Sequence, residues 1–379
     1  MTSVMSDIRE ARDQGIAAGE PPAAQARTDA ADPVSVIMPV RNEERHLAES
    51  VSHVLSQDYS GDLELVLAVG PSRDRTEDIA KRLAGADSRI TVVANPTGQI
   101  PSALNAAVRA ARHEIIVRVD GHALLPQGYI ATAVRTLRET GAVNVGGIMA
   151  AEGITPFQRA VAWAMTSPAG VGSASYHTGG SPGPADSVYL GAFRREAIEE
   201  VGGYDEQYLR AEDWEMNHRI KQAGGLIWFQ PGLAVTYRPR ATIAALGSQY
   251  FHYGRWRRVV ARQHAGTINL RYLAPPAVVV AIAAGMLAGI AGLAGLAAGA
   301  GGPVPLLVGG FALPALYLAG VAAVTVTAAR ALGGRCLVCL PVVLTTMHVC
   351  WGTGFLTSPR RLVPGGRASA GQPVGPAGQ

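Results

Sequence analysis

The sequence VSVIMPVRNEE at residues 34–44 begins as a short apolar run and becomes polar after Pro39. The apolar run predicts a buried strand that proline ends, since proline has no N–H to donate to a sheet. Further apolar runs follow at 63–69, 90–93 and 115–119, with helical patterns between them at 43–55, 76–83 and 102–111 (Ser102 as N-cap). Strands that alternate with helices predict βαβ units and a parallel sheet.

A second half of the same domain is predicted after residue 143. Strand-like runs occur at 143–148, 188–193, 226–229 and 234–237, and helical patterns at 195–201 and 212–222. A loop at 168–184, rich in Gly, Ser and Pro, interrupts them. Loops of this length are usually functional or disordered.

The chain after Tyr272 changes in composition. Only 16% of all residues are charged, and almost none lie between 275 and 355. The apolar spans 275–300 and 304–329 exceed the roughly 20 residues that a helix needs to cross a bilayer. A third span, 337–355, is shorter and carries His348, so that it either crosses or is re-entrant. All three cysteines lie in this region, where we expect them to pack rather than bind metal.

These patterns predict five segments. They are a disordered tail (1–31), an α/β domain (32–240), an amphipathic juxtamembrane segment (241–274), a membrane region of two to three helices (275–357) and a second disordered tail (358–379). The charged N-terminus does not read as a signal peptide, so we expect the α/β domain to stay in the cytoplasm.

Basic residues gather just before the first apolar span, namely Arg255, Arg257, Arg258, Arg262 and Arg271. A net charge of +4 does not argue for nucleic acid, whereas a juxtamembrane arginine cluster favours contact with anionic lipids on the cytoplasmic side. Three crossings would then put Arg360, Arg361 and Arg367 outside, against the same rule. A re-entrant third span would remove the conflict.

Ligands of parallel α/β sheets bind at the carboxyl ends of the strands, which predicts a site formed by residues 39–44, 70–74, 95–99 and 120–122. Asp120 and His122 are two residues apart at one such end and could both face a divalent cation, although a polar turn explains them as well. Such a cation would bridge a diphosphate.

Further candidates lie later in the chain. Glu212 and Asp213 open a helix, where an acid is either a general base or simply favourable to the helix dipole. His252, Arg255 and Trp256 precede the membrane region and form either an interfacial belt or a binding face for a sugar or lipid. His177, in the long loop, is a weaker candidate.

Taken in order, these motifs resemble the family 2 glycosyltransferases with the GT-A fold, an α/β nucleotide-diphospho-sugar transferase fold. The likeness spans residues 34–239. It includes residues 34–44 and 64–76, then Asn95, Gly98 and Asn105, Asp120-Gly121-His122 in place of the D-x-D motif, residues 192–195 and 201–206, and the Glu212-Asp213 pair. The membrane part looks most like bacterial succinoglycan-type exopolysaccharide transferases.

The resemblance implies an inverting, metal-dependent transfer from a nucleotide-diphosphate sugar to a lipid-linked saccharide, by a multi-pass protein of the bacterial inner membrane. Asp213, with Glu212, would be catalytic, and Asp120 and His122 would hold Mn²⁺ or Mg²⁺. Donor-binding positions would be Pro39, Arg41, Glu43, Asp74, Gly98, Asn105 and Asp120. Acceptor-binding positions would be His177, His252, Arg255 and Trp256, with residues 252–256 as a variant Q-x-x-R-W motif.

The sequence departs from the family pattern at two places. Val69 and Gly70 stand where the family has an acidic pair that helps to hold uridine, which leaves the base open. His122 replaces the second Asp of D-x-D, which favours manganese. A polyprenyl-phosphate glycosyltransferase and a non-catalytic polysaccharide-assembly subunit are the alternatives. A dehydrogenase is disfavoured, since no G-x-G-x-x-G follows the first strand.

Overall fold

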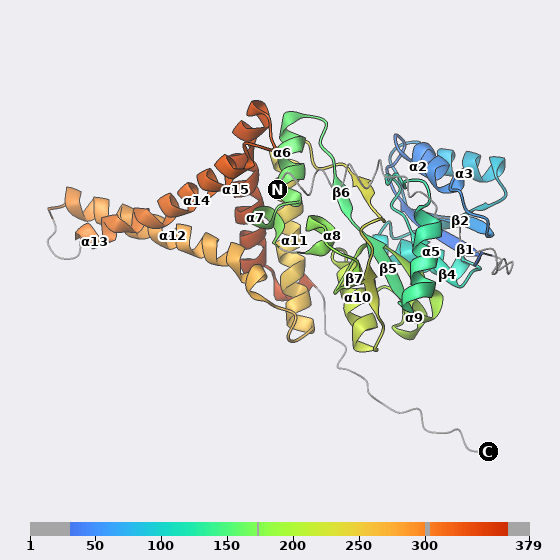
Figure 1. The fold of residues 1–379 in the computed structure, drawn as a ribbon. Helices are drawn as coiled ribbons and strands as arrows, with labels where there is room; N and C mark the ends of the chain where they lie inside the picture. The colour runs from blue at the N-terminus through green and yellow to red at the C-terminus, as the bar shows by residue number, and fades with distance from the viewer. Residues whose placement is uncertain (1–30, 173, 300–303, 363–379) are drawn as a thin grey trace, which may run out of the picture.

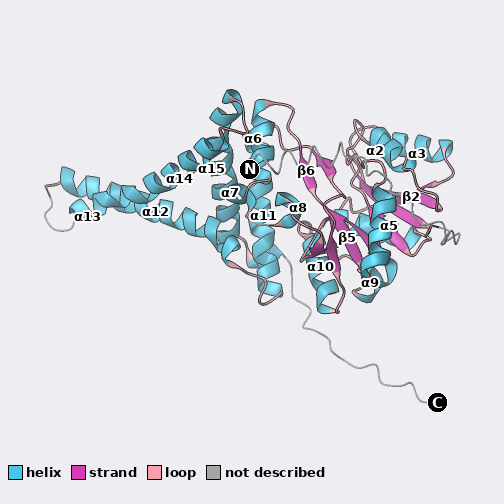
Figure 2. Cartoon of the chain, in the orientation of Figure 1, coloured by secondary structure: helices cyan, strands magenta, loops and turns pink. Residues whose placement is uncertain are grey.

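A mixed eight-stranded sheet organises the N-terminal domain in the computed structural model, which describes residues 31–172, 174–299 and 304–362 (Figures 1 and 2). The strand order is β3-β2-β1-β4-β8-β5-β9-β7. The first four strands are parallel, as predicted, and comprise β1 (Val34–Val40), β2 (Leu63–Val69), β3 (Ile90–Ala94) and β4 (Ile115–Arg118). Their carboxyl ends therefore meet at one edge of the sheet.

The second half of the sheet is mixed, and the sequence patterns made no prediction of strand direction there. β8 (Tyr189–Arg194) runs antiparallel to β4 and to β5 (Asn144–Gly147), and β9 (Ile227–Phe229) lies between β5 and the short β7 (Gly183–Pro184), parallel to β5 and antiparallel to β7. Hydrophobic periodicity does not encode strand direction. Here Arg195 donates to the backbone oxygens of Ala111 and His113, which fixes the end of β8 beside the start of β4.

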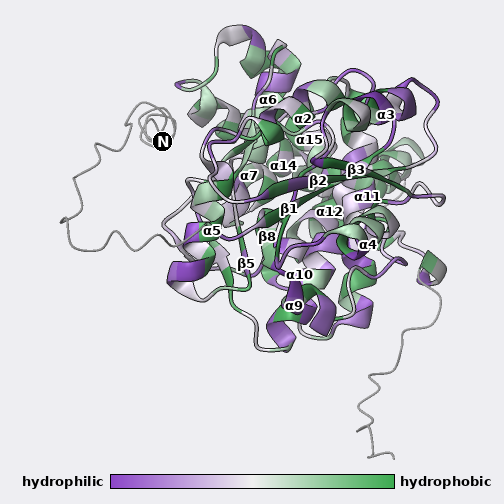
Figure 3. Ribbon diagram, turned by 90° about the vertical axis from the view of Figure 1, so that its right-hand side faces the viewer, coloured by the Kyte–Doolittle hydropathy of each residue, from purple (hydrophilic) through white to green (hydrophobic). Residues whose placement is uncertain are grey.

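Helices cover both faces of the sheet (Figure 3). On one face lie α2 (Leu47–Leu55), α3 (Thr76–Ala86) and α5 (Tyr129–Thr140), and on the other lie α4 (Ile100–Ala110), α9 (Arg195–Glu200) and α10 (Glu212–Gln222). Neighbouring residues of β1 contribute to both cores, because Val36 and Met38 pack on the first face and Ile37 on the second. The strands are buried on both sides, which explains their continuous apolar runs.

Some helix boundaries differ from the predictions. Ser102 is not an N-cap, since α4 begins at Ile100 and the Ser102 hydroxyl donates to Glu206 Oε2 at 2.7 Å. The long loop contains two short helices, α7 (Pro168–Val171) and α8 (Ser175–Thr178). We did not predict α5 or α6 (Pro156–Met165). Beside the main sheet, β6 (Met149–Ala151) pairs with β10 (Val235–Tyr237).

Two long helices pack together between the domain and the apolar hairpin, and they are α11 (Ile243–Gln263) and α15 (Gly334–Leu356) (Figure 1). Their backbones approach closely where each contributes a glycine. A Cβ on Gly254 would collide with the carbonyl oxygen of Trp351, and one on Gly354 with that of Phe251. The pair also contacts α6, so that α15 is joined to the α/β domain along much of its length.

The remaining apolar helices project away from this layer as a hairpin (Figure 1). It consists of α12 (Leu270–Ala297), then α13 (Val304–Val308), the 3₁₀ turn η1 (Gly309–Phe311) and α14 (Ala312–Ala328). Large apolar side chains are exposed along it, with Leu287 70% and Leu316 72% exposed. Residues Leu270–Ala297, Val304–Ala328 and Gly334–Leu356 are each long and apolar enough to cross a membrane.

The two predicted tails fall largely outside the described residues, as does Arg367. Of the C-terminal tail the structure describes residues 358–362, which include the 3₁₀ turn η2 (Arg360–Leu362).

Candidate active site

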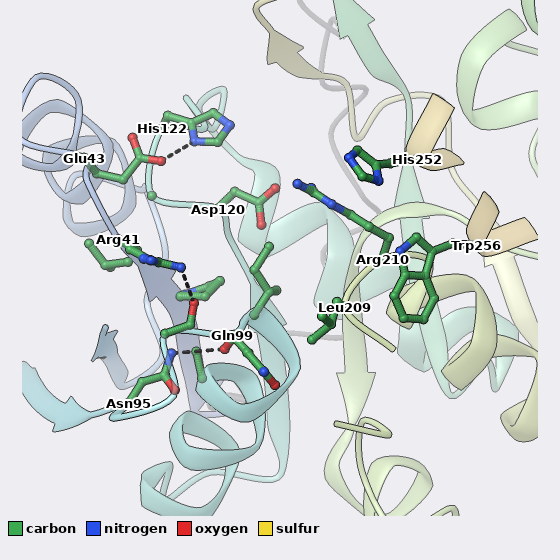
Figure 4. Close-up of a pocket in the computed structure, with 16 residues that line it drawn as sticks. Arg41, Glu43, Asn95, Gln99, Asp120, His122, Leu209, Arg210, His252 and Trp256 are labelled. Atoms are coloured by element: carbon green, nitrogen blue, oxygen red, sulfur yellow. Dashed lines mark hydrogen bonds and ion pairs between the residues drawn. The ribbon is translucent and has the colours of Figure 1, made fainter. Parts of the chain in front are cut away.

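A cavity of about 480 Å³ opens at the carboxyl ends of the parallel strands (Figure 4). Its walls come from three strand ends, from the segment before α10, and from α11. The lining residues are Pro39, Val40, Arg41, Glu43, Asn95, Gly98, Gln99, Ile100, Ala103, Asp120, Gly121, His122, Leu209, Arg210, His252 and Trp256. The position agrees with the expectation for a parallel α/β sheet.

The Arg41 side chain connects two strand-end loops through hydrogen bonds. Its Nε donates to Pro71 O at 3.2 Å and its Nη1 to Gly98 O at 3.1 Å. Gly98 has φ of +63°, and a Cβ there would lie 3.3 Å from the Arg41 guanidinium. A glycine is thus required both by the left-handed backbone and by the close approach of the arginine.

Arg118, the last residue of β4, joins three carboxylates. Its guanidinium lies 3.2 Å from Asp120 Oδ1 and 3.8 Å from Glu212 Oε1, and its Nη1 contacts Asp213 Oδ1. Burial alone would lower the pKa of Arg118, but the negative charges of Asp120 and Glu212 outweigh burial and raise it above its ordinary value. A permanently charged guanidinium therefore holds the acidic residues of two separate motifs together.

Glu212 and Asp213 occupy different environments although they are adjacent. The Glu212 side chain is 10% exposed and the Asp213 side chain 42%. Burial raises the pKa of Glu212, and Arg118 only partly opposes this effect. Neither Glu212 nor Asp213 lines the cavity. Asp213 is nevertheless linked to it, because Arg118 contacts both Asp213 and the cavity residue Asp120. Asp213 is the more accessible carboxylate of the pair.

His122 is held by Glu43, with Nδ1 and Oε1 2.8 Å apart (Figure 4). This hydrogen bond, together with the charge of Asp120, raises the pKa of His122 despite its partial burial. The described residues contain no cluster of three metal-ligating side chains. Asp120 and His122 nevertheless line the same cavity, from the turn that follows β4.

The opposite wall of the cavity comes from α11. His252 and Trp256 are one helical turn apart and both line the cavity, which brings these predicted acceptor residues to the predicted donor residues. Burial, with the positive charges of Arg210 and Arg255, lowers the pKa of His252. Trp256 is buried and its ring lies 6.0 Å from that of Tyr208.

Two predicted donor residues lie outside the cavity and have partners within the fold. The Asp74 carboxylate accepts hydrogen bonds from Thr76 and from Glu44 N, which orders the loop before α3. Asn105 donates to Tyr204 O at 2.8 Å and accepts from Tyr204 N at 2.9 Å. Asn105 therefore anchors the segment that leads to the cavity residues before α10.

Two predicted acceptor residues also lie outside the cavity. His177 is in α8 with its Nδ1 enclosed, and burial lowers its pKa to about 4. Arg255 does not line the cavity, and its guanidinium lies over the Phe251 ring, 5.4 Å from the ring centroid.

Five residues of the site were not predicted from the sequence, namely Ile100, Ala103, Arg118, Leu209 and Arg210. Arg210 extends into the cavity between Asp120 and His252 (Figure 4). The next residue, Ala211, has φ of +63°, which turns the chain into α10. Arg118 could have been found from the sequence, because it is a charged residue in an otherwise apolar strand. A buried charge of this kind requires partners of opposite charge nearby.

A family model described as Glycosyl transferase family 2 matches residues 35–202. The succinoglycan biosynthesis protein ExoA of Rhizobium meliloti is 34% identical over 245 residues, covering 64% of this chain and 74% of that protein. The dolichyl N-acetyl-alpha-D-glucosaminyl phosphate 3-beta-D-2,3-diacetamido-2,3-dideoxy-beta-D-glucuronosyltransferase of Methanococcus voltae is 22% identical over 258 residues, covering 64% of this chain and 77% of that protein.

Among solved structures, the mannosyltransferase PcManGT from Pyrobaculum calidifontis, in complex with GDP-Man and Mn²⁺, covers 94% of both chains. Its TM-score is 0.53 at 20% sequence identity. This likeness concerns the fold, and it confirms the fold class expected from the sequence.

Proposed function

Because this chain belongs to glycosyl transferase family 2, we propose that it is a membrane-anchored inverting enzyme. It moves a sugar from a nucleotide-diphosphate donor to a lipid-linked saccharide in cell-surface or exopolysaccharide synthesis. The observation that carries the proposal is the single cavity in which Asp120 and His122 lie across from His252 and Trp256. One wall suits a diphosphate and its cation, and the other suits a sugar ring.

Arg210 and the strand-end loops would bind the donor. Arg210 is exposed within the cavity and makes no ion pair among the described residues, so its guanidinium is free to contact diphosphate oxygens. Pro39, Glu43 and Gly98 line the same side, where backbone and side chains would enclose the nucleoside.

The residues present fit a divalent cation. His122 uses Nδ1 for Glu43, which leaves Nε2 for a metal, and Asp120 uses Oδ1 for Arg118, which leaves Oδ2. One imidazole nitrogen and one carboxylate oxygen suit Mn²⁺, with Mg²⁺ the second choice, and diphosphate oxygens and water would complete the coordination. When bound, the ion would supply positive charge to the leaving diphosphate.

Asp213 would take the proton from the acceptor hydroxyl while that oxygen bonds to the anomeric carbon. The bond between the anomeric carbon and the diphosphate oxygen breaks in the same step, and the configuration inverts. Arg118 contacts both Asp120 and Asp213, and this contact would fix the base relative to the donor. The buried Glu212 would act through Arg118 rather than on substrate.

The acceptor would reach the cavity from the membrane side. His252 and Trp256 belong to α11, which packs against α15, and α15 in turn packs against α12. ExoA is named for succinoglycan biosynthesis, and the Methanococcus relative for a dolichyl-phosphate-linked sugar. These names support an acceptor that carries a saccharide on a lipid, with Trp256 as a stacking face for the sugar.

We propose that α12 and α14 cross the bilayer and that α15 does not. Near its end, Trp351 of α15 stacks on Tyr272 in the first turn of α12, with ring centroids 6.3 Å apart. In the same helix, His348 Nε2 lies 2.8 Å from Ala169 O of α7 in the α/β domain. Because α15 contacts both the α/β domain and the start of α12, we place it on the same side of the membrane as the domain. Arg335 and Arg360 then share that side with the arginines of α11, in agreement with the positive-inside rule.

This topology predicts where reporter fusions are active. A reporter fused after residue 379 should be cytoplasmic, and one inserted between α12 and α13 should be on the opposite side of the inner membrane. Cysteine accessibility measured at the same two positions in intact cells checks the assignment. A C-terminal reporter active outside the cytoplasm would mean that α15 crosses.

Donor binding tests the proposed chemistry without an acceptor. Calorimetry on the full-length protein in detergent should detect nucleotide diphosphate with Mn²⁺, and binding should weaken at least about tenfold without the metal or in Asp120→Asn. Asp78→Asn, an exposed change on α3, is the matched control and should bind normally. No metal-dependent binding to any nucleotide diphosphate would favour a non-catalytic assembly subunit.

A further inference from the structure

A second cavity of about 290 Å³ lies beside the start of α12. It is enclosed by α10, the end of α11, the connection at 264–269 and the first turn of α12. Its lining residues are Asp186, Trp214, His218, Lys221, Gln222, Arg257, Ala265, Gly266, Thr267, Ile268, Asn269, Arg271 and Tyr272. It shares no lining residue with the active-site cavity, although Trp256 and Arg257 are adjacent in sequence.

The charges around this cavity are unbalanced. Arg257, Arg271 and Lys221 line it, but Asp186 is the only carboxylate that does so, and Asp186 is paired with Lys221. Among the described residues, neither Arg257 nor Arg271 has a carboxylate partner. The two guanidinium groups therefore carry positive charge that the protein itself does not neutralise.

Burial makes this imbalance costly. Arg257 is 7% exposed, and the Nε atoms of both arginines are enclosed without a hydrogen-bond partner. Both guanidinium groups lie over the Tyr272 ring, at 3.8 Å for Arg257 and 4.6 Å for Arg271, and Arg257 also lies 4.1 Å from the Trp214 ring. Arg257 donates to Thr267 O and Arg271 donates to the Tyr272 hydroxyl, and these bonds with the aromatic faces offset only part of the cost of burying two neighbouring cations.

We infer that this second cavity binds the phosphate group of an anionic membrane lipid. Two guanidinium groups with free N–H donors suit phosphate oxygens, which arginine contacts in a bidentate manner. Arg271 and Tyr272 belong to the first turn of the first apolar span, the level at which lipid headgroups lie. A bound headgroup would neutralise both arginines and fix the junction of α11 and α12. The inference rests on the proposed membrane anchoring, but not on sugar transfer.

Thermal stability of the full-length protein in neutral detergent tests this inference. Phosphatidylglycerol should raise the Tm at lower concentration than phosphatidylcholine, because a ligand stabilises the state that binds it. In Arg271→Gln the half-maximal concentration of phosphatidylglycerol should rise at least about tenfold, as expected for the loss of a charged hydrogen-bonding partner. Arg335→Gln removes the same charge from an exposed position at the start of α15 and should leave the response unchanged.

The outcomes separate the possible ligands. Equal responses in Arg271→Gln and Arg335→Gln would overturn the site, since general surface charge would then explain lipid binding. If inorganic phosphate reproduced the Tm increase at similar concentration, and Arg271→Gln abolished it, the lipid assignment would be overturned in favour of a free anion. The measurement contains neither donor nor acceptor, so its failure is distinct from failure of the proposed transferase activity.

Discussion

Asp213→Asn is expected to reduce sugar transfer by about 10²–10⁴-fold, because an amide cannot accept the proton of the acceptor hydroxyl. The replacement is nearly isosteric, and its remaining oxygen can still accept from Arg118. Asp213 does not line the donor side of the cavity, so nucleotide binding should persist. The variant thus separates the chemical step from donor recognition.

The measurement is the rate of nucleotide diphosphate release with a membrane extract as acceptor source. Asp78→Asn, on the exposed surface of α3, is the control for a carboxylate-to-amide change and should retain full activity. A phosphate acceptor needs no base. If Asp213→Asn retained most of its activity, a polyprenyl-phosphate glycosyltransferase would be the better description.

Arg118→Gln is expected to lower the free energy of unfolding by roughly 3–5 kcal/mol, the usual effect of removing one partner from a buried charge network. The substitution leaves Asp120, Glu212 and Asp213 near one another without their shared cation. Activity should also be lost, since the distance between Asp120 and Asp213 depends on this residue.

Denaturant unfolding and transfer activity should be measured together on this variant. Arg75→Gln is a suitable control, because Arg75 is 75% exposed and its ion pair with Glu44 is of the surface kind that contributes about 0–1 kcal/mol. Arg118→Lys keeps the charge but not the planar fork, and it should recover stability more than activity. If Arg118→Gln unfolded like the wild type, the proposed role of Arg118 would be wrong.

The fold was predictable where local pattern dominates. Residues 63–69 form a strand and residues 212–222 form a helix, both with the predicted limits. Turn residues follow the strand, and acidic residues occupy the first turn of the helix. The helix expected from residue 43 instead begins at Leu47. Residues 43–46 are held in a loop by Thr76 and Asp74, contacts about 30 positions away that no local pattern reveals.

The part of the candidate site that follows a strand was predictable from the topology of the sheet. Asp120 and His122 come directly after β4, so their location followed from the topology of a parallel sheet. Arg210 reaches the same cavity through a long-range contact, because Asn105 of α4 holds Tyr204 and so places the segment before α10. Sequence spacing contains no information about such a contact.

The arginine cluster before α12 illustrates the same limit. Read from the sequence it is one basic surface, but the structure divides it among several environments. Arg257 and Arg271 line the second cavity, Arg258 lies 4.8 Å from the Phe355 ring, and Arg262 donates to Ser358 O. Helical rotation about α11 decides the positions of Arg257, Arg258 and Arg262, whereas Arg271 belongs to α12, and the packing partners of these helices could not be inferred from hydropathy.

The most direct test of the account is a panel of nucleotide sugars incubated with the membrane-embedded protein and membrane extract, with and without Mn²⁺. We predict that at least one donor releases its nucleotide diphosphate in the presence of Mn²⁺ and labels a lipid-extractable saccharide, and that Asp120→Asn and chelation both suppress the reaction. Release that is equally fast after chelation, or labelled product that is never lipid-extractable, would contradict it.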